Sequence, residues 1–335
     1  MAVPVQGYSR MLDAYTFTNG GPKRLEFATG EEIPAEAGWV DLMQPSVTED
    51  RSAEAFLGAS LPTREEAAEI EFSSRFYTED GAVFMTATIL TGVDKGDATL
   101  VPFTLVVTGD SRIVTLRYDD VRALRQFLAR AGKPGSACSS TPGVFLGLVE
   151  ALVDRTADVL ERISADVDRI NAEIFAARTE RRGGRRLEQL IGDIGTQGDL
   201  AAKARESLAS LERLVQFASL TLRGGFAKGT SKNRLKLISR DVRSLEDHVD
   251  FLSNKITFLL DATLGLISVE QNEVIRILTI AATIFFPPTL IGTIYGMNFI
   301  GMPELSWGFG YPLAIGLMVA SAVLPYLYFK RRGWL

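Results

Sequence analysis

Neutral polar side chains recur along an otherwise apolar stretch near the C-terminus. The stretch carries Thr279, Thr283, Thr289 and Thr293, and Asn298 follows at its edge. Polar groups inside such a stretch tend to face a bundle interior or a watery path, whereas a single threonine more often bonds its own helix backbone. Taken alone, Asn298 could also cap the end of a helix. These residues therefore either line a polar path or serve the backbone.

Few other side chains offer chemistry. The 335-residue chain has one cysteine, Cys138, and one histidine, His248. These counts exclude an intrachain disulfide and a metalloenzyme with several His ligands. A net charge of −5 lacks the basic surplus typical of nucleic-acid binders. Residues 1–140 hold no cluster typical of an active site. We therefore expect no enzyme, no cofactor and no nucleic-acid partner.

Two long stretches without charged residues indicate membrane spans in a lipid bilayer. A span needs roughly 20 apolar residues, and residues 277–297 and 309–329 meet that length. The alternative is a pair of buried core helices. Arg276 and the basic tail 330–335 flank the spans, while the loop 299–308 has no Lys or Arg. The positive-inside rule therefore places the loop outside and both termini in the cytoplasm.

The residues before the spans predict a mixed domain followed by long helices. We expect an α/β domain over 1–140, an antiparallel helix pair over 141–228, and a stalk helix over 229–298 that continues into the first span. From residue 142 on, apolar residues recur at steps of three and four, which favours helix-on-helix packing. Stretches rich in β-branched and aromatic residues predict strands at 38–43, 70–77, 82–90, 101–108 and 113–118.

The end of the first span resembles a known family. Tyr295–Phe299 reads YGMNF, Met302–Leu305 reads MPEL, and the chain ends in a basic tail, Lys330–Leu335. In this order, after one span and around a second, these segments resemble the CorA magnesium-transporter family. The related proton-coupled Zn²⁺ transporters of the ZntB type are an alternative within the same fold. A third alternative, from another class, is a membrane-anchored cytoplasmic scaffold.

The resemblance implies a funnel-shaped homopentamer with two transmembrane helices per chain. It implies a selectivity filter of Asn298, Gly296, Met297 and Tyr295, with Glu304 in the external loop attracting cations. Mg²⁺ dehydrates reluctantly and prefers oxygen ligands, so Asn298 would bind the ion through its water shell. The implied pore-lining residues, from the filter inward, are Thr289, Phe286, Leu278, Ile275 and Asn272.

The resemblance also implies how transport is driven and regulated. The membrane potential would drive Mg²⁺ across a bacterial-type inner membrane. Co²⁺ and Ni²⁺ are further candidate ions. Intracellular Mg²⁺ would act as the regulatory ion by bridging carboxylates between subunits, with Asp241 and Asp261 as candidates. The arginine-rich segment 178–186 departs from the family's acidic pattern. It either meets anionic lipid headgroups or forms a solvated turn.

Overall fold

The computed structural model describes residues 12–18, 21–27, 31–109, 111–133, 138–177, 184–223, 226, 229–297, 302–303 and 307–334. The chain divides into two compact units. The first unit comprises residues 1–173 and 192–259, and the second comprises residues 174–191 and 260–335.

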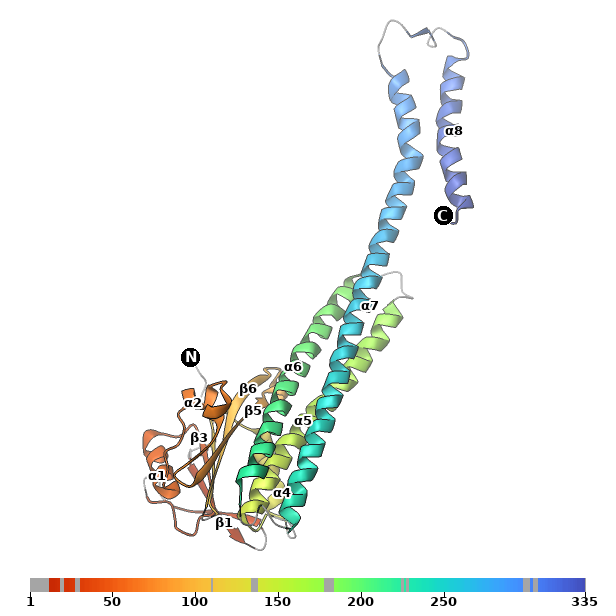
Figure 1. The fold of residues 1–335 in the computed structure, drawn as a ribbon. Helices are drawn as coiled ribbons and strands as arrows, with labels where there is room; N and C mark the ends of the chain where they lie inside the picture. Colours follow the sequence, from red (N-terminus) through yellow and green to blue (C-terminus); the bar gives the residue numbers. More distant parts are fainter. Residues whose placement is uncertain are drawn as a thin grey trace. The chain divides into compact units, whose positions relative to one another are not determined.

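The described strands of the first unit form one seven-stranded sheet in the order β2-β1-β3-β7-β6-β5-β4 (Figure 1). Strands β3 and β7 pair in parallel, and the other pairs are antiparallel. The bounds are β1 Leu12–Thr18, β2 Gly21–Leu25, β3 Trp39–Met43, β4 Phe76–Glu79, β5 Ala82–Thr91, β6 Thr99–Thr108 and β7 Ile113–Arg117.

The strand predicted over 70–77 is wrong for most of its length. The structure has a short helix there, α3 (Phe72–Arg75), and strand β4 begins only at Phe76. The apolar residues in the first part of this segment are not core residues, because Ile70 is 90% exposed and Phe72 is 50% exposed. Phe76 is buried and pairs with Met85 of β5. Strands β1 and β2, which precede residue 38, were not predicted.

Short helices join the strands. These are α1 (Val47–Leu57), α2 (Arg64–Ala68), the 3-10 helix η1 (Val93–Lys95) and α4 (Arg122–Ala131). Both α1 and α2 begin with a capping box, in which a hydroxyl and a glutamate satisfy the first free backbone N–H groups. Ser46 and Glu49 form the box of α1, and Thr63 and Glu66 form that of α2.

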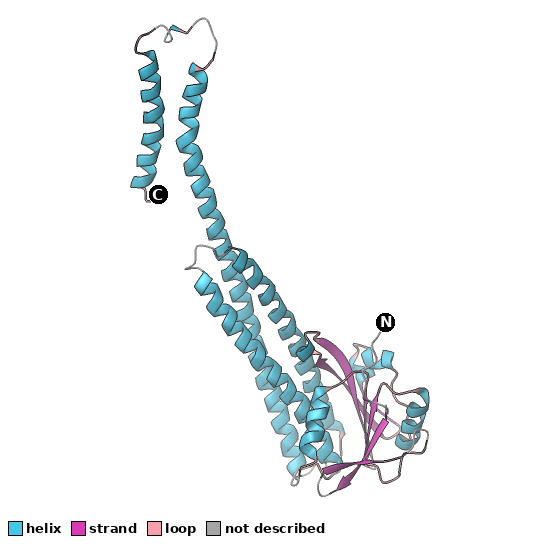
Figure 2. Cartoon of the chain, turned by 180° about the vertical axis from the view of Figure 1, so that it is seen from behind, coloured by secondary structure: helices cyan, strands magenta, loops and turns pink. Residues whose placement is uncertain are grey.

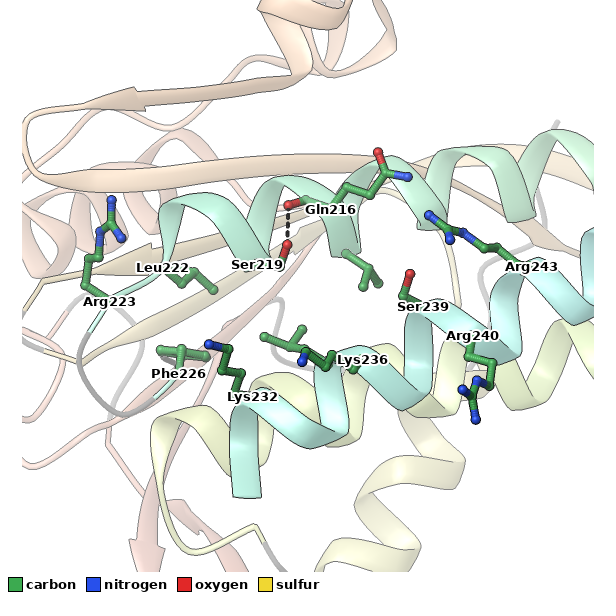
Figure 3. Close-up of a pocket in the computed structure, with 12 residues that line it drawn as sticks. Gln216, Ser219, Leu222, Arg223, Phe226, Lys232, Lys236, Ser239, Arg240 and Arg243 are labelled. Atoms are coloured by element: carbon green, nitrogen blue, oxygen red, sulfur yellow. Dashed lines mark hydrogen bonds between the residues drawn. The ribbon is translucent and has the colours of Figure 1, made fainter. Parts of the chain in front are cut away.

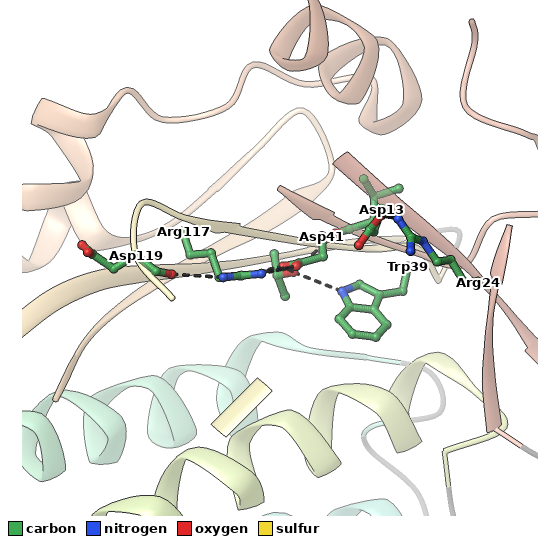
Figure 4. Close-up of polar contacts among 8 residues, drawn as sticks. Asp13, Arg24, Trp39, Asp41, Arg117 and Asp119 are labelled. Carbon is green, nitrogen blue, oxygen red and sulfur yellow. Dashed lines mark hydrogen bonds and ion pairs between the residues drawn. The ribbon is translucent and has the colours of Figure 1, made fainter. Parts of the chain in front are cut away.

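A buried ion pair joins the two parallel strands at the centre of the sheet (Figure 4). Arg117 of β7 contacts Asp41 of β3 at 2.8 Å, and both residues are less than 9% exposed. The Thr115 hydroxyl also donates to Asp41 at 2.6 Å, and the Trp39 indole donates to Thr115. Buried charges need such partners, so this network holds β3 and β7 in register.

Three long helices complete the first unit and extend beyond it. They are α5 (Thr141–Ala177), α6 (Gly184–Thr221) and α7 (Gly229–Tyr295). Within the first unit they lie side by side (Figures 1 and 2). Their contact faces carry buried aliphatic residues at steps of three and four, as helix-on-helix packing requires. On α7 these are Leu235, Ile238, Val242, Val249, Leu252, Ile256 and Leu259.

Asp94 of η1 fastens the sheet to helices α4 and α5. Its carboxylate contacts Arg122 of α4, and Arg155 and Arg162 of α5 at 2.7 and 2.8 Å. The hydrogen bond from Arg162, supported by those from Arg122 and Arg155, holds the pKa of Asp94 well below its usual range. One carboxylate thus joins three elements of the first unit.

The second unit contains the end of α7 and helix α8 (Gly310–Arg331). Among the described residues, α7 and α8 are the helices long and apolar enough to cross a membrane. Helix α7 continues through Pro287 and Pro288 to Tyr295. Both views place α8 alongside the end of α7 (Figures 1 and 2).

Candidate ion pathway

Helices α7 and α8 meet along a seam of residues three and four apart. On α7, Ile280 is 5% exposed, and half-buried residues follow at 284, 287, 291 and 295. On α8, buried Ala314 and Phe329 enclose half-buried residues at 318, 321, 322 and 325. This spacing is that of two packed helices. The seam defines which side of α7 faces its own α8.

The implied pore-lining residues lie mostly on the opposite side of α7. Thr289 lies nine residues, or about two and a half turns, beyond Ile280. By the same count on an ideal helix, Leu278, Ile275 and Phe286 fall within about 60° of Thr289, whereas Asn272 lies about a quarter turn away. All five of these residues are exposed in the single chain.

Exposure alone does not distinguish this face from one that meets lipid. Val274, Ile277 and Phe285 of α7 are exposed as well. The assignment of a pore face therefore depends on its position opposite the seam. In a ring of chains with α8 outermost, that face would point inward.

The four span threonines all bond their own helix. The hydroxyls of Thr279, Thr283, Thr289 and Thr293 each donate to the carbonyl four residues earlier, at 2.7–2.8 Å. The backbone-bonded interpretation of these residues is confirmed. This bond uses the hydroxyl proton and leaves the oxygen lone pairs able to accept a further hydrogen bond. An exposed threonine such as Thr289 can therefore accept a hydrogen bond from the water shell of a cation.

The prolines disturb the helix on the seam side. Proline has no N–H, so the carbonyls of Thr283 and Ile284 lose their usual helical donors. Pro287 lies seven residues, about two turns, after Ile280 and so faces α8. It is half-buried there. The disturbed backbone around Pro287 consequently lies away from the implied pore face.

The implied filter begins where α7 ends. Tyr295 is the last residue of α7. The backbone N–H groups of Gly296 and Met297 still bond helix carbonyls, at 3.0 and 3.2 Å. A Cβ at Gly296 would lie 3.1 Å from a backbone carbonyl oxygen, so a larger residue would require a shift. Asn298 and Glu304 lie outside the described residues.

The candidate regulatory aspartates do not form a site within one chain. Asp241 and Asp261 are both exposed on α7. Asp250, a neighbouring acid on this helix, contacts Arg205 of α6 at 3.2 Å. Across the described part of the chain, no three acidic, His or Cys side chains are grouped to hold a metal. Most of segment 178–186 lies outside the described residues.

Sequence reasoning missed one residue that positions the spans. Gly292 of α7 faces α8, and a Cβ there would lie 3.3 Å from the terminal methyl of Met318. A residue without a side chain at such a contact lets membrane helices approach closely. A glycine inside an apolar span was a readable signal.

The described residues thus define a class: a mixed α/β domain and long helices, joined to two apolar helices that can span a membrane. Residues 35–331 match the family described as CorA-like Mg2+ transporter protein. The chain belongs to this family.

Individual relatives agree over nearly the whole chain. The magnesium transport protein CorA of Yersinia pseudotuberculosis is 34% identical over 97% of this chain and 100% of its own length. The protein of the same name from Escherichia coli K12 is 33% identical over the same shares. The complete structure of the CorA magnesium transporter from Methanocaldococcus jannaschii superposes with a TM-score of 0.77. It covers 98% of this chain and 100% of its own and is 17% identical, so it is a likeness of fold.

Proposed function

We propose that this chain transports Mg²⁺ across a bacterial-type inner membrane as a homopentamer. The observation that carries the proposal is end-to-end identity of 34% with a protein named for magnesium transport. The YGMNF segment at the end of α7 supports it. Both termini would lie in the cytoplasm, because Arg276 and the basic tail flank the spans and positive flanks stay on the cytoplasmic side.

The pathway must be shared between copies, because two helices cannot enclose a watery lumen. We infer that the end of α7 from each chain lines the pore with the face opposite its α8 seam. Thr289 would offer lone pairs to a hydrated ion at mid-span. Phe286, Leu278 and Ile275 would form an apolar constriction that gates by losing its water.

The filter would recognise the hydrated ion. Mg²⁺ keeps its waters tenaciously, and a ring of Asn298 carbonyls would accept hydrogen bonds from them. Neutral oxygens bind weakly enough to release the ion, as conduction requires. Glu304 in the external loop would raise the local cation concentration.

The membrane potential would suffice to drive uptake. A divalent ion gains about 4.6 kcal/mol per 100 mV, twice the roughly 2.3 kcal/mol of a single charge. Rising intracellular Mg²⁺ would close the pore by bridging Asp241 or Asp261 to carboxylates of a neighbouring copy. A ligand that binds the closed state better shifts the population toward that state.

Replacement of the filter asparagine tests the proposal. Asn298→Ala should abolish selective Mg²⁺ uptake into proteoliposomes while the protein keeps a mass near five chains in detergent. The matched control is Asn233→Ala, which changes an exposed asparagine near the start of α7 and should leave uptake unchanged. Wild-type uptake and selectivity in a pentameric Asn298→Ala protein would contradict the proposed filter.

A further inference from the structure

A basic groove lies between the end of α6 and the start of α7, entirely within the first unit (Figure 3). Its cavity volume is about 600 Å³, within the range of small-molecule sites. Its apolar lining comes from four buried residues of α6, α7 and their link, Val215, Leu222, Phe226 and Leu235. Its cationic lining comes from five exposed residues, Arg223, Lys232, Lys236, Arg240 and Arg243.

The groove has more cations than the ion pairs of the fold neutralise. Of the five cations, Arg243 contacts a carboxylate, that of Glu212, at 2.9 Å. Glu212 also accepts a hydrogen bond from Gln216, which lines the groove. Within the described part of the chain, no ion pair engages the other four cations, and no carboxylate is among the described lining residues. The groove therefore has a surplus of about four positive charges.

The spacing of these cations is unfavourable for an empty helix face. Lys232, Lys236 and Arg240 follow one another at four-residue steps on α7, and like charges at this spacing repel. Lys232 also lies in the first turn of α7, where the helix macrodipole disfavours cations. A bound anion would relieve both effects.

The chemistry of the lining selects the kind of anion. Guanidinium groups bind phosphate through two parallel hydrogen bonds, and ammonium groups bind it as point charges. The apolar lining offers no hydrogen-bond partner to phosphate, but an uncharged ring can pack against it. We propose that this groove binds a nucleoside polyphosphate, with the phosphate chain against the α7 cations and the nucleoside toward the apolar lining.

Nucleotide binding to the groove does not depend on ion transport, so a direct measurement of binding tests it. Full-length protein in detergent is titrated calorimetrically with ATP at physiological salt, with EDTA present to keep the nucleotide free of Mg²⁺. We expect saturable binding of one ATP per chain and none of adenosine, which lacks phosphate. Inorganic tripolyphosphate, which lacks the nucleoside, should bind at least tenfold more weakly than ATP.

Charge-neutral variants locate the site. Lys236→Gln combined with Arg240→Gln should weaken ATP binding at least tenfold. Both residues are exposed, so an unchanged melting temperature and oligomeric mass will verify folding. The matched control is Arg213→Gln, because Arg213 is an exposed α6 cation outside the groove. Its ATP affinity should equal that of the wild type.

Three results would overturn the proposal. Absence of ATP binding to the wild-type protein would overturn it, whether the groove is open or is covered by a second copy of the chain. Wild-type affinity in the double variant would exclude this site. Equal affinity for tripolyphosphate and ATP would exclude the nucleoside. Excess Mg²⁺ should weaken binding, because it neutralises part of the phosphate charge, and tighter binding with Mg²⁺ would contradict a site built from cations.

Discussion

Replacing Thr289 with valine isolates the role of one oxygen on the implied pore face. Valine keeps the branched shape and stiff χ1 of threonine but removes the hydroxyl. That hydroxyl donates to the Phe285 carbonyl at 2.7 Å, and Thr289 is exposed. On an ideal helix it lies on the side opposite Ile280. In a pentamer, the substitution would remove five acceptors from one level of the pathway.

The expected effect follows from the worth of single hydrogen bonds. One acceptor for an ion-bound water contributes on the order of 1 kcal/mol net. If the hydrated ion contacts about two of the five hydroxyls at once, Thr289→Val raises the barrier by ~2 kcal/mol, which slows passage about thirtyfold. We would measure the initial rate of Mg²⁺ uptake into proteoliposomes with an imposed potential.

Thr283→Val is the matched control. The Thr283 hydroxyl makes the same kind of bond, at 2.8 Å, but Thr283 lies within about 60° of Ile280 on the seam side of an ideal helix. Its uptake should stay within about twofold of the wild type, since surface and seam hydroxyls contribute little to the ion. Wild-type rates for Thr289→Val together with slow uptake for Thr283→Val would refute the assignment of the two faces.

Three further perturbations test the rest of the account. Asp41→Ala should destabilise the first unit by about 3–5 kcal/mol, because it removes the carboxylate that contacts the buried Arg117 charge. Denaturant unfolding measures this change, and a loss below about 1 kcal/mol would contradict it. The depressed pKa of Asp94 predicts a contribution to stability that is full at neutral pH and declines as the pH falls below about 4. Asp94→Asn should therefore reduce the fall of the melting temperature at acidic pH. An unaltered dependence of the melting temperature on pH would contradict the stabilising role of the Asp94 ion pairs. Asp241→Asn and Asp261→Asn should each weaken inhibition by Mg²⁺ on the cytoplasmic side, and unchanged inhibition in the double variant would remove both residues from the sensor.

The helical part of the fold was readable because its signals are long and regular. Steps of three and four persist through the first half of α7, and the stretch after Arg276 carries no charge until Glu304. Residue composition was less informative for the sheet. Residues 70–77 have the composition of a strand, but Ile70 and Phe72 lie outside the core, so composition there did not reflect burial.

The candidate site was only partly predictable. Sequence resemblance supplied the names of the implied pore residues, but not the side of α7 on which they lie. That side follows from the seam of buried Ile280 and the half-buried residues 284, 287, 291 and 295, which is a property of packing between two helices. The sequence left open whether the Thr289 hydroxyl bonds its own helix, and the structure shows that it donates to the Phe285 carbonyl.

The most direct test of the central claim is Mg²⁺ flux through the purified protein driven by voltage alone. Proteoliposomes would be loaded with a Mg²⁺ indicator. The imposed potential would be negative on the side that represents the cytoplasm, and the pH would be equal on both sides. We predict uptake that increases with the potential and persists without a pH gradient. Uptake that requires a proton gradient, as in a proton-coupled Zn²⁺ transporter, or no uptake above protein-free vesicles would contradict the account.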